Sequence, residues 1–397
     1  MSEAMRAFIS SLALVPLVLQ AQIPGLEPEK QWELSGYINY MLTGTLVDDG
    51  EDFFDNQVHN RLDFEYRFNS NLRFNTGVRN RLFWGDSAKN ELYREVIGVD
   101  PGYLDLTFNW GEGSDFFANT QFDRLYLDWH GEHYQARAGR FRINWGMNTI
   151  WNPNDIFNSY SIYDVDYPER PGTDALYLTR KLGYASELNL AFSPSQDSEL
   201  NSYSARYLFN VANWDAQFII GKSNLDFVIG GGLATDLAGA SLKVESTLFS
   251  PTKDDWQTAE GNVQELNTSV VSSFELGYSF SGTRNWMSTV ALLHITEPQE
   301  VQNAIAYLNL PLTARTLSFT EFTAYADLGF DITPLNRIVF SGSYYNDDSF
   351  YLGVSSTYSL SNDWQLVMLA QRFDGASDSL FGQTPNTLIF VNLGWNF

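Results

Sequence analysis

Apolar and polar residues alternate with a period of two along most of the chain. In residues 31–43, and again in residues 59–68, mainly apolar side chains occupy the even positions and mainly polar ones the odd positions. This period is that of a β-strand with one apolar and one polar face. A soluble β-sandwich would bury the apolar face. A membrane barrel would instead turn it towards lipid and let the polar face line a water-filled lumen.

The alternation recurs between turn-forming residues as far as residue 397, and it predicts about 18 strands, with 16 as the alternative. Some strands are joined by pairs such as Gly183-Tyr184, whereas others are joined by long segments: 250–268, 295–319 and 374–385. Short turns on one rim and long loops on the other are typical of bacterial outer-membrane barrels. We therefore predict an all-β fold, a transmembrane antiparallel β-barrel with short periplasmic turns and long extracellular loops.

Both ends of the chain carry patterns typical of exported proteins. Residues 1–21 combine Arg6, an uncharged apolar run and the small residue Ala21, which is the pattern of a secretory signal peptide. The expected mature domain, residues 22–397, is a single barrel whose last strand alternates up to the terminal Phe397. This strand resembles the C-terminal recognition signal of bacterial outer-membrane proteins, which the barrel-assembly machinery is thought to read. The resemblance implies the bacterial outer membrane as location, with its lipid and the assembly machinery as partners.

Composition narrows the classes of function. The net charge of −24 disfavours binding to nucleic acid, and the absence of cysteine excludes disulfides and thiolate chemistry. After residue 21 no apolar stretch reaches about 18 residues, so no transmembrane helix is expected. Aromatic residues make up 15% of this polar chain, as expected for aromatic girdles at two membrane interfaces.

Residues 146–174 are rich in Asn, Asp, Pro, Gly and aromatic residues and are far longer than an ordinary connection. They join the fifth and sixth predicted strands, so they form the third external loop. The preceding run from Gly139 to Gly146 resembles the Gly-Arg-Gln…Trp-Gly run of the porin superfamily, although Phe141 stands where Gln is usual. In classical porins this loop folds inward as a constriction, commonly acidic, opposite basic residues of the wall. The resemblance implies the same role for residues 146–174.

The strand before this loop carries Arg137, Arg140 and Arg142, and the parity of the arginines changes after the first of them. We predict a β-bulge at Gly139, because bulges favour glycine and re-aim side chains at functional sites. Such a bulge would place all three arginines on one face and leave Phe141 on the other.

Arginines are unevenly distributed along the chain, since 13 of 18 lie between Arg61 and Arg206. An arginine facing lipid at mid-bilayer costs about 2–4 kcal/mol, so these side chains are expected to point inward. Rows of basic side chains favour anions, and an acidic loop opposite creates a transverse field. The expected pore-lining and selectivity residues are Arg61, Arg73, Arg79, Arg81, Arg124, Arg137, Arg140, Arg142, Asp155, Asp164, Asp166 and Glu169.

Two other interpretations of these charges stay open. The arginines could serve only to pair with neighbouring carboxylates such as Asp63, Glu65, Asp123 and Asp128. Complete pairing would leave the pore nearly unselective or even cation-preferring. The acidic residues of the loop could instead hold Ca²⁺, which takes hard oxygen ligands, although the EF-hand spacing is absent. No other cofactor is expected.

Together these features favour an outer-membrane channel for passive diffusion of small polar solutes, anions in particular. The alternatives are a substrate-specific export or uptake channel for organic or fatty substrates, and a structural or assembly-partner barrel with a plugged lumen. An enzyme is not expected, because His59, His130, His133 and His294 form no recognisable catalytic arrangement with a serine and an acid. A homo-oligomer is a further alternative, since small residues cluster at 230–241 and would give a smooth interface.

Overall fold

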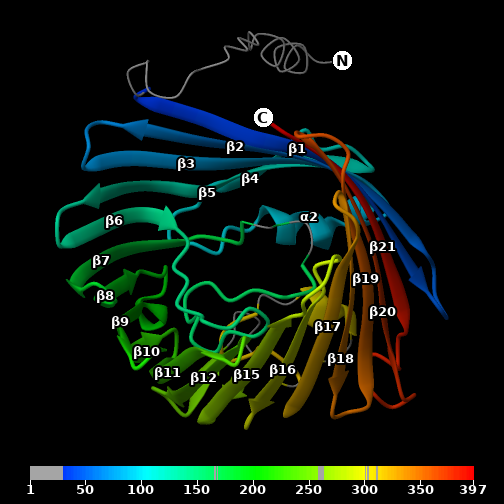
Figure 1. The fold of residues 1–397 in the computed structure, drawn as a ribbon. Helices are drawn as coiled ribbons and strands as arrows, with labels where there is room; N and C mark the ends of the chain where they lie inside the picture. Colours follow the sequence, from blue (N-terminus) through cyan, green and yellow to red (C-terminus); the bar gives the residue numbers. More distant parts are fainter. Residues whose placement is uncertain are drawn as a thin grey trace. The chain divides into compact units, whose positions relative to one another are not determined.

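The computed structural model describes residues 30–164, 167, 169–257, 263–299, 301, 304–309 and 312–397. The predicted signal peptide, residues 1–21, lies outside the described residues. From Trp32 onwards the described residues form 18 strands that close into one antiparallel barrel, so the predicted fold is confirmed. Figure 1 shows the strands as a ring in which β1 and β21 meet.

The barrel strands are β1 (Trp32–Val47), β2 (Phe53–Arg67), β3 (Leu72–Gly85), β5 (Phe116–His130), β6 (Tyr134–Phe141), β7 (Thr173–Gly183), β8 (Ser186–Ser193), β9 (Ser202–Val211), β10 (Trp214–Ser223), β11 (Asp226–Leu237), β12 (Ala240–Pro251), β15 (Ser269–Ser279), β16 (Met287–Ile295), β17 (Phe322–Thr333), β18 (Asn336–Tyr345), β19 (Ser349–Ser359), β20 (Trp364–Gly375) and β21 (Asn386–Asn396). The loops contain η1 (Ser87–Lys89), α2 (Glu91–Gly98), β4 (Thr107–Trp110), η2 (Ser198–Leu200), β13 (Asp255–Gln257), β14 (Val263–Glu265) and α3 (Ala304–Asn309). None of the described helices is long and apolar enough to cross a membrane.

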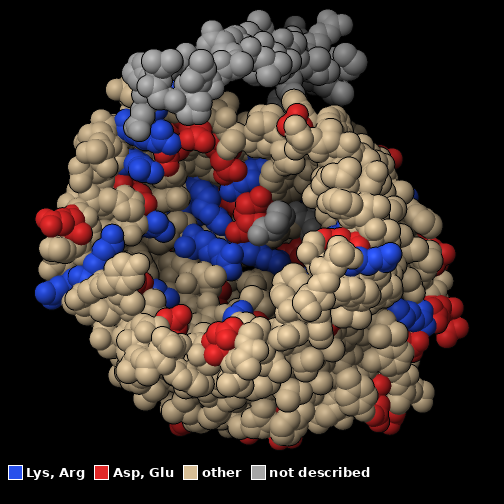
Figure 2. All heavy atoms as spheres, viewed as in Figure 1, with Lys and Arg blue, Asp and Glu red and all other residues tan. Residues whose placement is uncertain are grey.

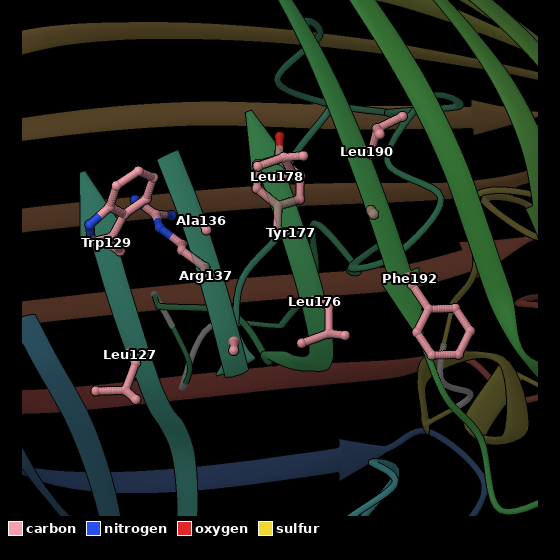
Figure 3. A pocket seen from close by; sticks show the side chains of 11 residues that line it. Leu127, Trp129, Ala136, Arg137, Leu176, Tyr177, Leu178, Leu190 and Phe192 are labelled. Atoms are coloured by element: carbon pink, nitrogen blue, oxygen red, sulfur yellow. The ribbon is translucent and has the colours of Figure 1, made fainter. Parts of the chain in front are cut away.

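The outer face of the wall is apolar, as the alternation predicts. On β5, Leu127 and Trp129 are exposed on the outside, whereas Asp128 between them is buried. Figure 3 shows Leu127 and Trp129 beside a shallow hollow of about 500 Å³, which extends across β6 to Leu176 of β7 and Phe192 of β8. An outer surface of this kind suits contact with acyl chains.

Strand β6 is short, and its early end lets the chain that follows enter the barrel. After Phe141 the chain turns into the barrel as the third loop, residues 142–172 (Figure 1). The upper part of β5 then takes a different partner: β4, from the second loop (residues 86–115), pairs with its residues 118–121. Arg140 fills the junction, with its guanidinium 2.7 Å from Asp100 of the second loop and 2.8 Å from Asp174 of β7. The second loop therefore completes the wall where β6 ends.

The predicted β-bulge at Gly139 is wrong. Strand β6 pairs with β5 and with β7 through Gly139 without any shift in register. Gly139 has a φ of +124°, a conformation that suits glycine and needs no inserted residue. The bulge of this region lies in β5, where Asp123 is the extra residue opposite the step from Gly77 to Val78.

Without a bulge in β6, the arginines of that strand do not gather on one face. Arg140 keeps the opposite parity to Arg137 and lies within the junction of the wall. Phe141, which was expected on the other face, is buried in the interior cluster together with Ile143. The apolar residues after Gly139 thus pack into the interior, Phe141 at the end of β6 and Ile143 in the loop that enters the barrel.

Two further external loops also fold onto the inner wall. Buried side chains of the third loop and of residues 296–321 pack against inward-facing wall residues: Trp145, Trp151, Ile156, Ile219, Val228, Leu293 and Leu317. A second buried cluster joins α3 and residues 376–385 to β18, β19 and β20: Tyr307, Tyr345, Tyr351, Phe373 and Phe381. The apolar core of the protein therefore lies inside the ring of strands, where it fixes the loops.

Candidate functional site

Two carboxylates of the inner wall hold the first half of the third loop. Glu245 of β12 accepts hydrogen bonds from the backbone N–H groups of Met147 and Asn148. Glu275 of β15 accepts one from the N–H of Thr149 at 2.6 Å. Hydrogen bonds to a charged acceptor contribute about 1.5–3 kcal/mol each. These carboxylates therefore fix the loop backbone against the wall.

Glycines in β11 let the loop approach this wall closely. A Cβ atom at Gly230 would lie 2.8 Å from Oδ1 of Asn154, and one at Gly232 would lie 3.0 Å from Nδ2 of the same side chain. The Asn154 amide donates to the carbonyl of Gly231 at 2.9 Å and accepts from the hydroxyl of Thr247 at 2.7 Å. The two inward glycines thus make room for the loop, a role that their sequence did not indicate.

The middle of the third loop is held at a second part of the wall, β18 to β20, by an aromatic residue. The hydroxyl of Tyr163 donates to Ser343 of β18 at 3.1 Å and hydrogen-bonds with Tyr345. Its ring packs edge-on against Tyr351 and Phe373, with centroids 4.8 and 5.4 Å apart. The loop therefore extends from the wall of β12 and β15 to that of β18, β19 and β20.

The end of the loop is bound to the arginine-rich strands. The ring of Tyr167 lies under the guanidinium of Arg79, and its hydroxyl donates to Asp123. Glu169 accepts a hydrogen bond from the hydroxyl of Tyr37 at 3.0 Å, and its other oxygen is 3.9 Å from Nε of Arg61. Three parts of the inner wall thus hold the loop across the lumen.

Several of the arginines predicted to line the pore are paired with carboxylates. Arg61 contacts Asp63 at 2.8 Å and Asp123 at 2.6 Å, and it is almost fully buried. Arg137 lies 3.1 Å from Asp128. Arg73 is more exposed and lies 3.7 Å from Glu65, so the charges of these arginines are largely compensated.

Three other predicted arginines donate hydrogen bonds to neutral groups. Arg79 donates to His59 and to Gln121, each at 3.3 Å, and its guanidinium carbon is 3.4 Å from the centre of the Tyr167 ring. Arg81 donates to Asn119 at 2.8 Å. Arg124 donates to three backbone carbonyls, those of residues 123, 169 and 170, and it also lies 3.6 Å from the carboxylate of Asp123.

The remaining predicted arginines lie away from this group. Arg140 is buried in the junction of the wall, between Asp100 and Asp174. Arg142 belongs to the third loop, where its guanidinium lies 5.4 Å from the centre of the Tyr160 ring. Neither side chain belongs to the group of arginines around Arg61 and Arg79.

The acidic residues of the third loop do not form a single surface opposite the arginines. Asp155 is fully buried, and Asp164 lies 3.8 Å from Arg170 of the same loop. Glu169 alone of the described acidic loop residues meets the wall of Arg61, and Asp166 lies outside the described residues. An acidic loop facing a basic wall is therefore realised at one position among the described residues.

Burial also affects the acid chemistry of the loop. Desolvation raises the pKa of Asp155 to about 7, although Arg142 and the backbone N–H groups of Trp145 and Asn158 oppose the rise. Within the described ranges no three His, Asp or Glu side chains are placed to hold a metal ion. Ca²⁺ binding by the third loop stays a prediction.

Charged side chains are unevenly distributed inside the ring. Figure 2 shows a hollow with Lys and Arg (blue) gathered on the side of β2, β3 and β5, with Asp and Glu (red) among them. Other parts of the interior that are visible in this view carry mostly uncharged side chains. The lumen therefore has one charged side, on which the end of the third loop is held.

Sequence reasoning missed most of the residues that position the loop. Glu245, Glu275 and Asn154 hold it through hydrogen bonds, and Tyr163 and Tyr167 hold it through their rings. The carboxylates on the polar faces of β12 and β15 were the available signal, although Glu275 also has a partner on the wall, Lys243, at 2.9 Å.

Comparisons with known proteins identify the architecture. No family model matches the chain, and no curated protein matches it. The structure of OccK11 (OpdR) of Pseudomonas aeruginosa covers 92% of this chain and 96% of its own, with a TM-score of 0.55 and 10% sequence identity. OccAB4 of Acinetobacter baumannii covers 94% and 100%, with a TM-score of 0.57 and 9% identity. OpdQ of Pseudomonas aeruginosa covers 93% and 99%, with a TM-score of 0.57 and 10% identity.

Proposed function

Because the chain has the fold of the bacterial outer-membrane porins, we propose that it is an outer-membrane channel through which small polar solutes diffuse passively. The third loop is the observation that carries this proposal. It is held at three separate parts of the inner wall, and a hollow remains inside the ring (Figure 2). A loop that narrows a lumen and is held rigidly gives a channel a defined size limit. No catalytic role is assigned to the histidines, since porins are channels and not enzymes.

The charge preference of the channel rests mainly on Arg79. No described carboxylate lies within ion-pair distance of its guanidinium, and one of its terminal nitrogens is buried without a hydrogen-bond partner among the described residues. A charge that meets no carboxylate among the described residues, in a poorly hydrated environment, acts over a longer range than a paired one. Arg79 is itself only 3% exposed, so it would act on solutes through its field and not by direct contact. This arrangement supports selectivity for small anions.

The paired arginines limit the size of this preference. Arg61, Arg73 and Arg137 each lie close to a carboxylate, so they contribute local dipoles more than net charge. We therefore expect a modest preference for anions, one that a single substitution at Arg79 abolishes.

The test is the reversal potential of the refolded protein in a planar bilayer under a KCl gradient. Arg79→Gln should keep a measurable conductance while the anion preference falls towards none. The matched control is Arg180→Gln, which removes the same charge from an exposed side chain beside Tyr134, outside the lumen. Equal reversal potentials for the wild type and Arg79→Gln would refute the assignment of selectivity to Arg79. Absence of any conductance would refute the channel itself.

A further inference from the structure

Four amide side chains surround a glycine on the inner wall, where the barrel closes. Gly394 of β21 pairs with Asn39 of β1 on one side and with Gln365 of β20 on the other. Asn392 and Asn396 lie two residues before and after it, so they share its inward-facing row. Because the central position has no side chain, the four amides leave a pit of about 210 Å³.

The third loop borders this pit. Tyr37 of β1 and Glu169 of the loop both line it, and the tyrosine hydroxyl donates to the carboxylate at 3.0 Å. A Cβ atom at Gly394 would lie 2.6 Å from Oδ1 of Asn39, so a larger residue would fill the space between the amides. The pit is therefore built from fixed wall positions and from a loop residue that is itself hydrogen-bonded.

The amides around the pit have unused hydrogen-bonding capacity. None of the four makes a side-chain hydrogen bond to another described residue, and Oδ1 of Asn392 is buried. Each amide offers two donor hydrogens and an acceptor oxygen. Buried polar atoms in proteins are nearly always hydrogen-bonded, so Oδ1 of Asn392 requires a donor. The amides of Asn39, Gln365 and Asn396 are more exposed and are open to a ligand that both donates and accepts.

We propose that this pit is a binding subsite for a neutral polyhydroxylated solute, such as one sugar ring or a small polyol. A hydroxyl group donates and accepts at once, which matches the mixed capacity of the amides. Glu169 is the one charged residue among those that line the pit, and its carboxylate accepts hydrogen bonds from hydroxyls but repels anions. The inference deepens the proposed function, because a solute reaches the pit only through the lumen.

The volume of the pit limits the size of the solute. Pockets for drug-sized ligands usually measure about 300–1,000 Å³, and this one is smaller. It is suited to one ring rather than to a chain of rings. Neutral solutes would thus pause at the β1, β20 and β21 wall, while anions respond to the field of the buried Arg79 of β3.

The experiment measures binding of D-glucose and of D-gluconate to the detergent-solubilised protein by saturation-transfer NMR. Gly394→Val fills the pit, Asn392→Ala removes one of its amides, and the matched control is Asn75→Ala, on the inward row of β3. We expect D-glucose to bind the wild type and the control, to bind both pit variants at least fivefold more weakly, and to bind more tightly than gluconate. Strand content and heat-modifiable gel mobility establish that each variant is folded.

Three results would overturn the proposal: no D-glucose binding to the wild type, unchanged binding to both folded pit variants, or gluconate binding as tight as glucose binding. Conductance is recorded separately on the same preparations. Glucose binding without conductance would refute the channel but leave the subsite standing. Conductance without glucose binding would refute the subsite but leave the channel standing.

Discussion

The guanidinium carbon of Arg79 lies 3.4 Å from the centre of the Tyr167 ring, so the end of the third loop is stacked on the wall that it faces. The hydroxyl of Tyr167 also donates to Asp123, which is paired with Arg61. One residue thereby connects the position of the loop to both kinds of arginine, the paired and the unpaired. Changes at this residue should alter pore size and charge preference together.

Replacing Tyr167 with alanine should release the end of the loop. A buried cation–π contact contributes about 2 kcal/mol or more, and a hydrogen bond to a carboxylate about 1.5–3 kcal/mol. We expect a larger single-channel conductance and more open-channel noise in planar bilayers. Tyr167→Phe keeps the ring but loses the hydrogen bond, so its conductance should lie between that of the wild type and that of Tyr167→Ala. Wild-type currents from Tyr167→Ala would show that this contact does not hold the loop.

Replacing Gly232 with valine should push the third loop away from the inner face of β11. The added side chain would meet Asn154 and Met147, each about 3.0 Å from the new Cβ. Overpacking of this kind costs about 1–3 kcal/mol, which urea unfolding in detergent can measure. Gly231→Val is the control, since its Cβ would meet only the carbonyl of Gln217 at 3.6 Å. Equal losses of stability in both variants would argue against close packing of the third loop on Gly232.

Asp155 should make stability depend on pH. Its pKa is raised from 3.8 to about 7 in the folded protein, so the folded state binds more protons than the unfolded state between these values. Stability should therefore fall as pH rises from 4 to 7, by at most about 4 kcal/mol. Asp155→Asn should remove the contribution of this carboxyl and so flatten the curve, whereas Asp164→Asn, at an exposed position, should leave it unchanged. Unfolding midpoints measured at pH 4.5, 6 and 8 test this, and parallel curves for the wild type and Asp155→Asn would contradict it.

Arg140 should matter for stability and not for selectivity. Arg140→Leu leaves the buried carboxylates of Asp100 and Asp174 without their partner, and breaking a buried ion pair typically costs about 3–5 kcal/mol. Unfolding in urea should shift accordingly, while the reversal potential of surviving channels stays at its wild-type value. Arg140→Lys should recover only part of the loss, because an ammonium group does not reproduce the forked hydrogen bonds of Arg140. A shift in reversal potential in either variant would place Arg140 in the pore.

The fold could be predicted from the sequence because apolar and polar residues alternate within each barrel strand. Residues such as Leu127 and Trp129 alternate with Asp128, and this local pattern needs no knowledge of the strand's neighbours. The number of strands and the asymmetry of the connections follow from repeating that observation. The presence of a bulge at Gly139 could not be decided from the sequence, because a change of parity in the arginine positions can have two causes. The chain either inserts a residue or leaves the strand, and here β6 ends at Phe141.

The site was harder to predict because it depends on contacts between residues far apart in the chain. Arg61 and Arg79 occupy equivalent alternating positions, yet Arg61 meets two carboxylates and Arg79 meets a histidine, an amide and a tyrosine. The alternation along a strand predicts which face a side chain lies on, but it does not predict which residues that side chain contacts. The roles of Glu245 and Glu275 were hidden for the same reason, since their partners are backbone groups nearly one hundred or more residues away.

The short strand β4 gives the barrel a preferred order of assembly. It is separated from β5 only by the turn that follows Trp110, so the two form a hairpin from neighbouring residues. Pairings between neighbours in sequence form faster than distant ones. We therefore expect β4 to cover residues 118–121 of β5 before the residues after Phe141 compete for them. Those residues then have no strand left to extend, and the interior is where their aromatic side chains can be buried.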